Sequence, residues 1–333
     1  MKPIPKHFSQ TTLNRRDFLK LSMATYCTSI LSGISGCQSS TPLKIACQIW
    51  PGYSFFYLAR DQGLLPTTAI ELIQTENLAA SADALAKGQV DGAALTIDEV
   101  IQLLDKGIAL QIILVLDASA GADSLLVKPE IKKLSDLKGK RIGVESSNLG
   151  TIMLTKLLEA SHLSHDDIIS IPMNYDHLQA WNDQQLDGVI SYDPVSILFA
   201  KKGLKRLWDS RGIPGLIVDV LAVRVEALEK QTKSLTHLVN AHFQAQLLWQ
   251  KNPIDTTYLL AKILQIPPEE IKSAFMGIDL PDASFNRHYL SPPTKELKQS
   301  ILELSEIMIK NNLIKKTPDL DHLFTPDFIP GDL

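Results

Sequence analysis

Short apolar runs alternate with longer amphipathic stretches from residue 43 to about residue 201. This alternation is typical of βα units built around a parallel sheet. The period then becomes helical, at 232–250, 253–264, 269–275 and 294–310, so we expect a helical C-terminal layer without its own sheet. The apolar runs predict strands at 43–49, 70–74, 92–95, 110–116, 141–145, 168–172 and 188–191, and the amphipathic stretches predict helices at 55–65, 79–87, 97–106, 152–160 and 194–201.

Two segments of the chain, 86–98 and 182–194, resemble each other. Each ends a helix, passes through an apolar-Asp-Gly turn, forms a short buried strand and stops at a polar turn. This weak repeat indicates two similar α/β lobes, although Asp-Gly turns are common enough for a chance likeness. Because ligands bind outside the carboxyl ends of strands in open α/β sheets, we expect Thr96 in one lobe and Tyr192 and Asp193 in the other to face a common cleft.

The N-terminal residues read as an export signal. A paired arginine within 14–20 precedes a short, weakly apolar stretch that ends at Cys37. This order is typical of a twin-arginine signal peptide of the lipoprotein type at 1–36, followed by a lipidated tether at 37–42. Asn14 replaces the usual Ser or Thr, so the general secretory route stays open. We expect a lipoprotein anchored through Cys37 on the periplasmic side of a membrane, inner or outer.

The net charge and the cysteine content limit the kinds of partner and bound group that we expect. Without residues 1–36 the chain has 28 basic and 36 acidic side chains, a formal charge of −8, and such a surface repels phosphate backbones. We therefore expect no nucleic-acid partner. Cys27 is removed with the signal peptide and Cys37 carries the lipid, so Cys47 is the one remaining thiol. The sequence therefore predicts neither a disulfide framework nor a set of metal-spaced cysteines. The His and Asp residues of 162–167 are read as a solvated surface cluster, and we expect no metal and no cofactor.

Five motifs in order carry a family resemblance. They lie at 50–53 (WPGY), 56–64 (FYLARDQGL), 88–93 (GQVDGA), 117–123 (DASAGAD) and 136–145 (DLKGKRIGVE). The chain resembles the substrate-binding proteins of ABC importers in the nitrate, sulfonate and taurine group, which includes the thiamine-pyrimidine-synthase-like proteins.

The resemblance implies an α/β, two-lobed type II periplasmic-binding-protein fold with two crossover strands and a helical C-terminal layer. It further implies a monomer that works with an ABC permease in the membrane and closes around a small-molecule ligand. The expected lobes are 43–125 plus 218–333 and 126–217, with crossovers near 124–128 and 216–224.

Polar and aromatic residues at strand ends supply the candidate cleft. Trp50 and Tyr53 follow the first strand, where they either wall in a ligand or pack as half-buried residues. We expect Trp50 to be exposed in the empty cleft. Ser147 and its neighbours stand between a strand and a helix, where they either hold an anionic group or cap the helix. The expected ligand-binding residues are Trp50, Gly52, Tyr53, Thr96, Asp117, Ser119, Asp123, Glu145, Ser147, Asn148, Thr151, Tyr192 and Asp193.

Acidic residues dominate these strand ends. Five carboxylates lie at or just after apolar runs, while no Arg or Lys occupies an equivalent position, which favours a ligand with amino, hydroxyl or heteroaromatic donors. The alternative is that most of these acids cap helices or pair with Lys128, Lys140 and Arg224. The five acids are Asp117, Asp123, Glu145, Asp193 and Asp219.

Catalytic motifs are missing from the sequence: it has no Gly-x-Ser-x-Gly, His-Glu-x-x-His, P-loop or Gly-x-Gly-x-x-Gly, and it lacks the cysteine-rich stretch of the pyrimidine-synthase relatives. We therefore expect no enzyme but an extracytoplasmic solute-binding lipoprotein of an ABC importer. Its ligand would be a small organic molecule of the amino, sulfonate or pyrimidine type. A ligand-sensing subunit for a membrane signalling protein and, less favoured, a thiamine-pyrimidine-type enzyme remain as alternatives.

Overall fold

A computed structural model describes residues 41–291 and 294–331. Backbone contacts divide the chain into two units, Met1–Thr41 and Pro42–Leu333, and the second unit contains the elements described below. The predicted signal peptide, Cys37 and the tether up to residue 40 lie outside the described residues. Within the described ranges no helix is both long and apolar enough to cross a membrane.

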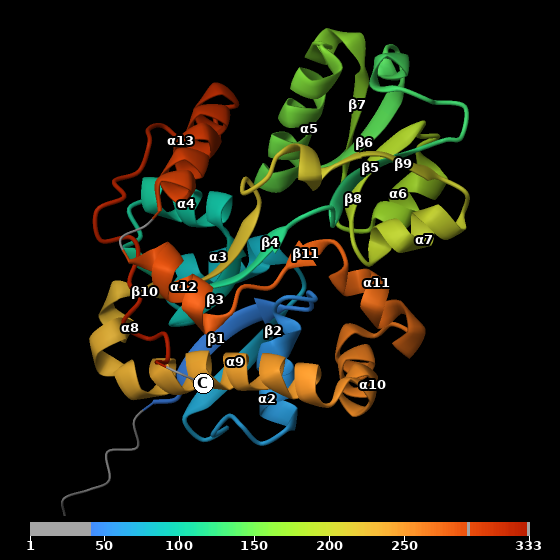
Figure 1. The fold of residues 1–333 in the computed structure, drawn as a ribbon. Helices are drawn as coiled ribbons and strands as arrows, with labels where there is room; N and C mark the ends of the chain where they lie inside the picture. Colours follow the sequence, from blue (N-terminus) through green and yellow to red (C-terminus); the bar gives the residue numbers. More distant parts are fainter. Residues whose placement is uncertain (1–40, 292–293, 332–333) are drawn as a thin grey trace, which may run out of the picture. The chain divides into compact units, whose positions relative to one another are not determined.

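The first sheet has the strand order β11-β4-β10-β3-β1-β2 (Figure 1). β1 pairs in parallel with β2 and β3, whereas β10 runs antiparallel to β3 and β4. β11 is a two-residue strand that pairs with the end of β4. The strands are β1 (Leu43–Gln48), β2 (Ile70–Thr75), β3 (Gly92–Thr96), β4 (Leu110–Ser119), β10 (Val218–Arg224) and β11 (Ile278–Asp279).

The second sheet has the order β7-β6-β8-β5-β9. β6 pairs in parallel with β7 and β8, and β5 runs antiparallel to β8 and β9. The strands are β5 (Asp123–Val127), β6 (Arg141–Glu145), β7 (Ile169–Met173), β8 (Gly188–Tyr192) and β9 (Lys205–Asp209).

The chain passes from the first sheet to the second between β4 and β5 and returns between β9 and β10. Both sheets are therefore mixed: the strands of the βα units pair in parallel, as expected, whereas β5 and β10 run antiparallel to their neighbours. The reason is that β5 and β10 each enter their sheet directly after a crossing, without the helix that would reverse the chain direction. The βα rhythm of the sequence identifies only the strands that belong to βα units.

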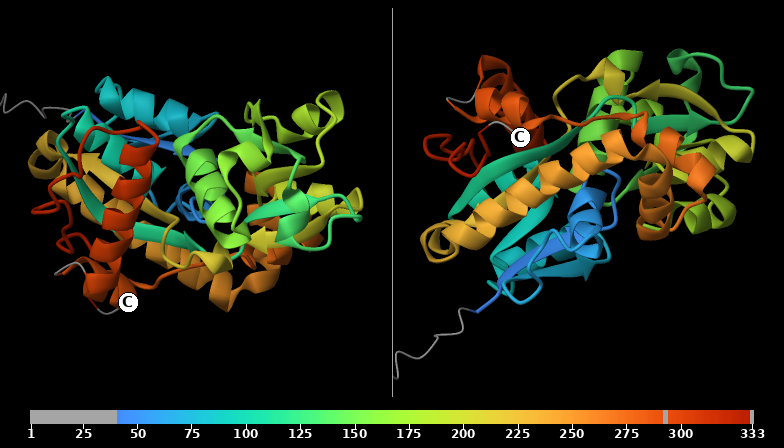
Figure 2. Two further views of the ribbon diagram at one scale, coloured as in Figure 1. Left: turned by 90° about the horizontal axis from the view of Figure 1, so that it is seen from above. Right: turned by 60° about the horizontal axis from the view of Figure 1, so that its bottom comes forward.

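Helices cover both sheets. α3 and α4 pack against β3, while α2 packs against the long helix α9 and α10. α5, α6 and α7 pack against the second sheet, and Figure 2 shows the long helix α9 crossing the first. The α-helices are α2 (Ser54–Asp61), α3 (Leu78–Ala86), α4 (Ile97–Asp105), α5 (Asn148–Ser161), α6 (His177–Asp183), α7 (Val195–Lys201), α8 (Val225–Lys230), α9 (Thr232–Lys251), α10 (Pro253–Leu264), α11 (Ile271–Phe275), α12 (Ala283–Leu290) and α13 (Lys295–Lys310). The 3₁₀ helices are η1 (Leu134–Leu137), η2 (His165–Asp167), η3 (Ser210–Gly212) and η4 (Pro268–Glu270).

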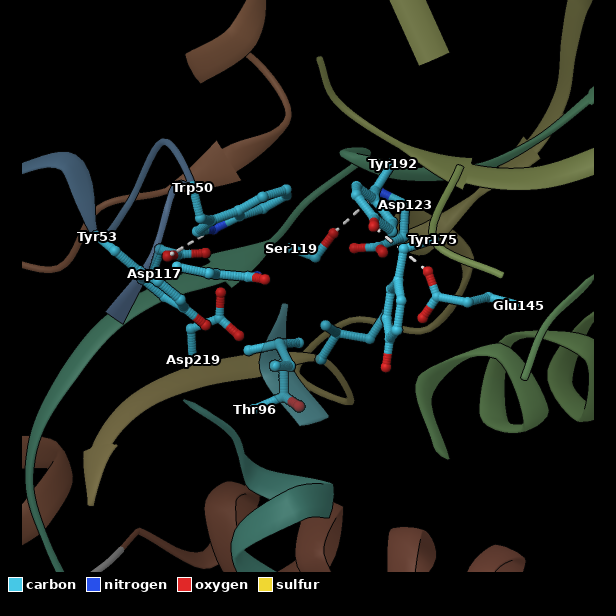
Figure 3. Close-up of a pocket in the computed structure, with 13 residues that line it drawn as sticks. Trp50, Tyr53, Thr96, Asp117, Ser119, Asp123, Glu145, Tyr175, Tyr192 and Asp219 are labelled. Carbon is cyan, nitrogen blue, oxygen red and sulfur yellow. Dashed lines mark hydrogen bonds between the residues drawn. The ribbon is translucent and has the colours of Figure 1, made fainter. Parts of the chain in front are cut away.

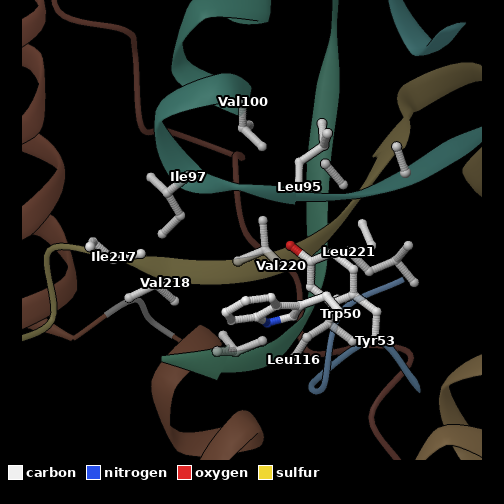
Figure 4. Packing of buried hydrophobic residues seen from close by; sticks show 14 of the residues in the cluster. Trp50, Tyr53, Leu95, Ile97, Val100, Leu116, Ile217, Val218, Val220 and Leu221 are labelled. Atoms are coloured by element: carbon white, nitrogen blue, oxygen red, sulfur yellow. The ribbon is translucent and has the colours of Figure 1, made fainter. Parts of the chain in front are cut away.

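The core of the first sheet reaches the edge where the two sheets meet. Every residue of β3 is buried, and so is every residue of β10 from Val218 to Val223. Figure 4 shows Trp50 and Tyr53 packed among side chains of β3, β4 and β10. Two aromatic residues predicted for the cleft thus belong to the apolar core as well, which fixes their position in the cleft wall.

Candidate functional site

A cavity lies where the ends of strands from the two sheets face each other (Figure 3). It holds about 450 Å³ of empty space, including its mouth open to solvent. Ligand pockets in open α/β proteins typically lie at strand ends such as these. Eight residues expected from the sequence line it: Trp50, Tyr53, Thr96, Asp117, Ser119, Asp123, Glu145 and Tyr192.

Five further lining residues were not in the predicted set: Gln48, Leu78, Tyr175, Ile217 and Asp219. Asp219 had been noted as one of the acids at strand ends, but it had not been selected. Gln48 ends β1, and Leu78 begins α3. Tyr175 lies in the loop between β7 and α6, and Ile217 precedes β10, so no strand-end rule identifies either residue.

Trp50 is held in place by two contacts. Its Nε1 donates a hydrogen bond to Asp117 Oδ2 at 3.1 Å, and its ring meets the Tyr192 ring edge to face with centroids 6.0 Å apart. These partners leave the residue only 8% exposed. The expectation that Trp50 is exposed in the empty cleft is therefore wrong, although the residue does line the cavity.

Asp117 and Asp219 form a pair of carboxyl groups on neighbouring strands. They are register partners of β4 and β10, and each carboxyl lines the cavity. Burial raises the pKa of Asp117 to about 7, while burial and then the Asp117 charge raise the pKa of Asp219 well above its ordinary range. Two carboxylates this close cannot both ionise readily, so they hold a proton between them.

The Tyr53 hydroxyl completes this group. Burial, together with the charges of Asp219 and Asp117, raises the pKa of this hydroxyl well above the usual range. The phenol therefore stays protonated and acts as a donor. The second oxygen of Asp219, Oδ1, is buried without a hydrogen-bond partner in the described part of the chain.

Gly52 lies behind Asp117. A Cβ atom at position 52 would stand 1.7 Å from Asp117 Oδ2, far inside van der Waals contact. The glycine expected to bind ligand is thus not among the residues that line the cavity. It provides the space that the Asp117 carboxyl occupies.

Asp123 stands at the start of β5, just after the first crossing between the sheets. Burial raises the pKa of its carboxyl to about 7, despite a hydrogen bond with the Ser119 side chain. The Ser119 hydroxyl is also 2.7 Å from the hydroxyl of Ser210, which lies on the return crossing. Hydroxyl contacts therefore link the two crossings beside this buried carboxyl.

Glu145 is fixed on the second sheet by a histidine that the sequence did not single out. His177 Nε2 lies 3.0 Å from Glu145 Oε2, and His177 Nδ1 lies 2.9 Å from the Ser191 hydroxyl. The Tyr192 hydroxyl donates to the same Glu145 oxygen at 3.3 Å. One Glu145 oxygen thus orients Tyr192, and the carboxyl contributes further negative charge to the cavity.

Three predicted residues at the start of α5 do not line this cavity. Ser147 caps the helix, because its hydroxyl accepts a hydrogen bond from the Gly150 N–H at 3.0 Å. Thr151 donates its hydroxyl to the Ser147 carbonyl. Asn148 accepts a hydrogen bond from Gln102 Nε2 at 3.2 Å and, with Ser147, lines a neighbouring cavity. The capping alternative therefore describes Ser147.

Asp193 also lies outside the cavity. It accepts hydrogen bonds from Ser196 and Arg206, and the Arg206 Nη2 to Asp193 Oδ1 distance is 3.2 Å. Burial raises the pKa of this carboxyl to about 6 and outweighs the opposing effect of the guanidinium. The contacts of Asp193 are those of a structural ion pair.

The other four acids do not pair with the basic residues considered from the sequence. Lys128 pairs with Asp187, and Arg224 pairs with Glu226. No Arg, Lys or His is among the cavity-lining residues of the described chain. The described residues also contain no group of three or more His, Cys, Asp or Glu side chains placed to hold a metal ion.

The chain is similar to one protein-family model and to several solved structures. A family model described as NMT1/THI5 like matches residues 50–254. Comparison with curated protein sequences gives no match.

Similar solved structures include binding proteins and an enzyme. The periplasmic aliphatic sulphonate binding protein SsuA from Escherichia coli is 20% identical, with a TM-score of 0.70 over 85% of this chain and 97% of that one. The alkanesulfonate-binding protein SsuA from Xanthomonas axonopodis pv. citri, bound to MOPS, is 18% identical, with a TM-score of 0.66 over 84% and 96%. The DszB C27S mutant in complex with biphenyl-2-sulfinic acid is 16% identical, with a TM-score of 0.64 over 86% and 97%. The predicted two-lobed α/β fold is thereby confirmed.

Proposed function

The chain belongs to the NMT1/THI5-like family, and we propose from this membership and from its cleft that it is the solute-binding component of an ABC importer. It takes up a small organic molecule between its two sheets and delivers it to a membrane permease. The observation that carries the proposal is the cavity between the sheets, with aromatic walls and buried polar groups. Hinge closure would shield the ligand from water.

Binding rather than catalysis is supported by the state of the cysteine next to the cleft. Cys47 is the only cysteine among the described residues, and the fold is shared with an enzyme whose structure carries a cysteine substitution. Burial raises the pKa of the Cys47 thiol to about 12, and its Sγ contacts the Gln48 carbonyl. A thiol in this state is not a nucleophile at neutral pH.

We further propose that the protein acts on the periplasmic side as a monomer, tethered through a lipid on Cys37. The support is the sequence motif that ends at this cysteine. The Cys37→Ser variant is expected to leave the membrane fraction or to stay unprocessed. A variant that is cleaved after Gly36 and still firmly membrane-bound would refute the tether.

The experiment for the main proposal is to identify the molecules that co-purify with the protein and to add them back. We expect one small organic molecule, a change in tryptophan fluorescence on its addition, and a smaller radius of gyration by small-angle X-ray scattering. Conversion of the molecule to a product would support an enzyme instead. The absence of any bound molecule from cell extract, combined with unchanged scattering across a metabolite panel, would refute solute binding.

A further inference from the structure

One carboxyl oxygen in the cavity wall lacks a hydrogen-bond partner in the described part of the chain. Asp219 is 5% exposed and lines the cavity, yet its Oδ1 atom has no hydrogen-bond partner within residues 41–291 and 294–331. Figure 3 shows Asp117 and Asp219 on one side of the cavity with Trp50 and Tyr53. A buried carboxylate oxygen without a donor is costly, and a ligand N–H group would satisfy it.

The remaining walls suit a cation. Trp50, Tyr53, Tyr175 and Tyr192 surround the carboxyl groups, and the faces of such rings attract ammonium and guanidinium-like groups. Trp50 is anchored by Asp117 and cannot swing away without losing that bond. An aromatic cage with carboxylates in its wall therefore offers two independent sources of attraction for a positive charge.

We propose, as a refinement that depends on the solute-binding function above, that the ligand is a compact organic cation with N–H donors, an ammonium or amidinium, which binds the Asp117–Asp219 pair and displaces the proton held between the two carboxyl groups. The ligand donates its N–H groups to the carboxylates and keeps its own charge. The displaced proton leaves to solvent, so each binding event releases close to one proton.

The groups around the pair all favour this exchange. Tyr53 before α2 and Asp123 on β5 are the titratable groups that act on the pair, and Glu99 on α4 and Cys47 on β1 act in turn on Tyr53. All four are neutral or negative. A cation about 4 Å from a carboxyl at an effective dielectric constant of about 20 lowers its proton affinity roughly a thousandfold. This effect favours ionisation of the pair when the cation is bound.

An anionic ligand meets the opposite situation. The solved structures with similar folds include proteins named for sulphonate binding, whereas the cavity of this chain has four carboxyl groups and no basic side chain among its described lining residues. A sulfonate placed here would lie beside Asp117, Asp123, Glu145 and Asp219 without a counter-charge. The proposed cation preference therefore separates this chain from those relatives.

Matched probes test the charge preference directly. Benzamidine and benzylamine are cations, benzamide is a neutral analogue, and benzenesulfonate is an anion of similar size. Isothermal titration calorimetry at pH 7.5 in phosphate and in Tris reports the protons released, because the two buffers differ in ionisation enthalpy. We expect only the cations to bind, release of close to one proton, and affinity that rises up to tenfold per pH unit between pH 5.5 and 7.5.

Three results would overturn the inference: binding of benzamide or benzenesulfonate as tight as that of the cations, equal enthalpies in the two buffers, or a co-purified ligand that is neutral or anionic. The last result would leave the solute-binding function intact, so the two proposals fail separately. A protein that binds neither a co-purified molecule nor any probe would fail both.

Substitutions test whether Asp117 and Asp219 are responsible for cation binding and proton release. Asp219→Asn is expected to abolish proton release and to weaken benzamidine binding at least thirtyfold, while Asp117→Asn does the same through the other carboxyl. Asp166→Asn removes an exposed acid of η2 and is the charge-matched control, expected to bind like the unmodified protein. Near-ultraviolet circular dichroism checks that each variant is folded. Unchanged proton release in the folded Asp219→Asn variant would overturn the assignment.

Discussion

The raised pKa of the Asp123 carboxyl can be tested through the pH dependence of protein stability without ligand. Its carboxyl is 4% exposed, and burial raises its pKa from the ordinary 3.8 to about 7. A carboxyl whose pKa is higher in the folded state than in the unfolded chain supports folding fully below pH 3.8, and that support is lost as the pH rises through about 7. Asp123→Asn removes this dependence because the amide stays neutral at every pH.

The size of the effect follows from the two pKa values. Relative to a neutral side chain, Asp123 costs about 1.7 kcal/mol of folding free energy at pH 5 and about 4.3 kcal/mol at pH 8. The free energy of unfolding of Asp123→Asn should therefore rise by about 2.5 kcal/mol relative to the unmodified protein between pH 5 and pH 8. This difference between two pH values cancels any constant effect of the amide on packing.

The assay is urea unfolding of both ligand-free proteins at half-unit steps from pH 5 to pH 8, with Asp166→Asn as a control expected to run parallel to the unmodified protein. Thermal melting gives a second measurement, with an expected gain of about 5 °C in Tm across this range for Asp123→Asn. Parallel pH curves for Asp123→Asn and the unmodified protein would refute the reasoning. They would show that water reaches this carboxyl in the ligand-free protein and that burial does not raise its pKa.

Three further changes probe the cleft. Trp50→Ala should destabilise the ligand-free protein by about 3 kcal/mol in urea unfolding, since the ring is packed, and a loss under 1 kcal/mol would mean that the ring is exposed. Gly52→Ala should displace the Asp117 carboxyl and abolish ligand binding in calorimetry. Gly331→Ala is the control and should bind normally, because a Cβ there meets nothing within 4 Å. Equal binding by both variants would contradict the steric argument. Glu303→Ala removes a 2.8 Å ion pair with Lys156 that joins α13 to α5. Scattering should show a larger radius of gyration for the ligand-free variant, and calorimetry should show up to about fivefold weaker ligand binding. An unchanged radius of gyration would exclude this pair as a closing contact.

Much of the fold follows from the hydrophobic pattern. The predicted strand at 92–95 is β3 (Gly92–Thr96), and the predicted helix at 97–106 is α4 (Ile97–Asp105). Such elements bury a continuous apolar run or a one-sided stripe, and both patterns survive in the sequence. β9 (Lys205–Asp209) was not predicted, because an edge strand with charged residues has no such run.

The site was harder to predict for a geometric reason. The rule that ligands gather at carboxyl ends of strands identified Thr96 and Glu145, which end parallel strands. Asp219 stands near the amino end of β10, and it reaches the same edge because β10 runs antiparallel to its neighbours. Strand direction depends on the crossing between sheets, which the local pattern does not encode. Asp193 lies outside the cavity lining, and its partner Arg206 lies on β9, the strand that the pattern missed.

The pairing of Asp117 with Asp219 is the feature that a stability argument alone does not explain. Like charges directly opposite each other on neighbouring strands destabilise a sheet, and burial makes the effect larger. A protein selected only for folding would carry an apolar or an oppositely charged pair here. The pair becomes intelligible if its cost is removed on binding, because a cation that satisfies both carboxylates stabilises the closed, ligated protein more than it would a neutral cleft. Ligand affinity and the instability of the empty cleft then have one origin, and a neutral Asp219→Asn cleft should gain stability and lose its ligand together.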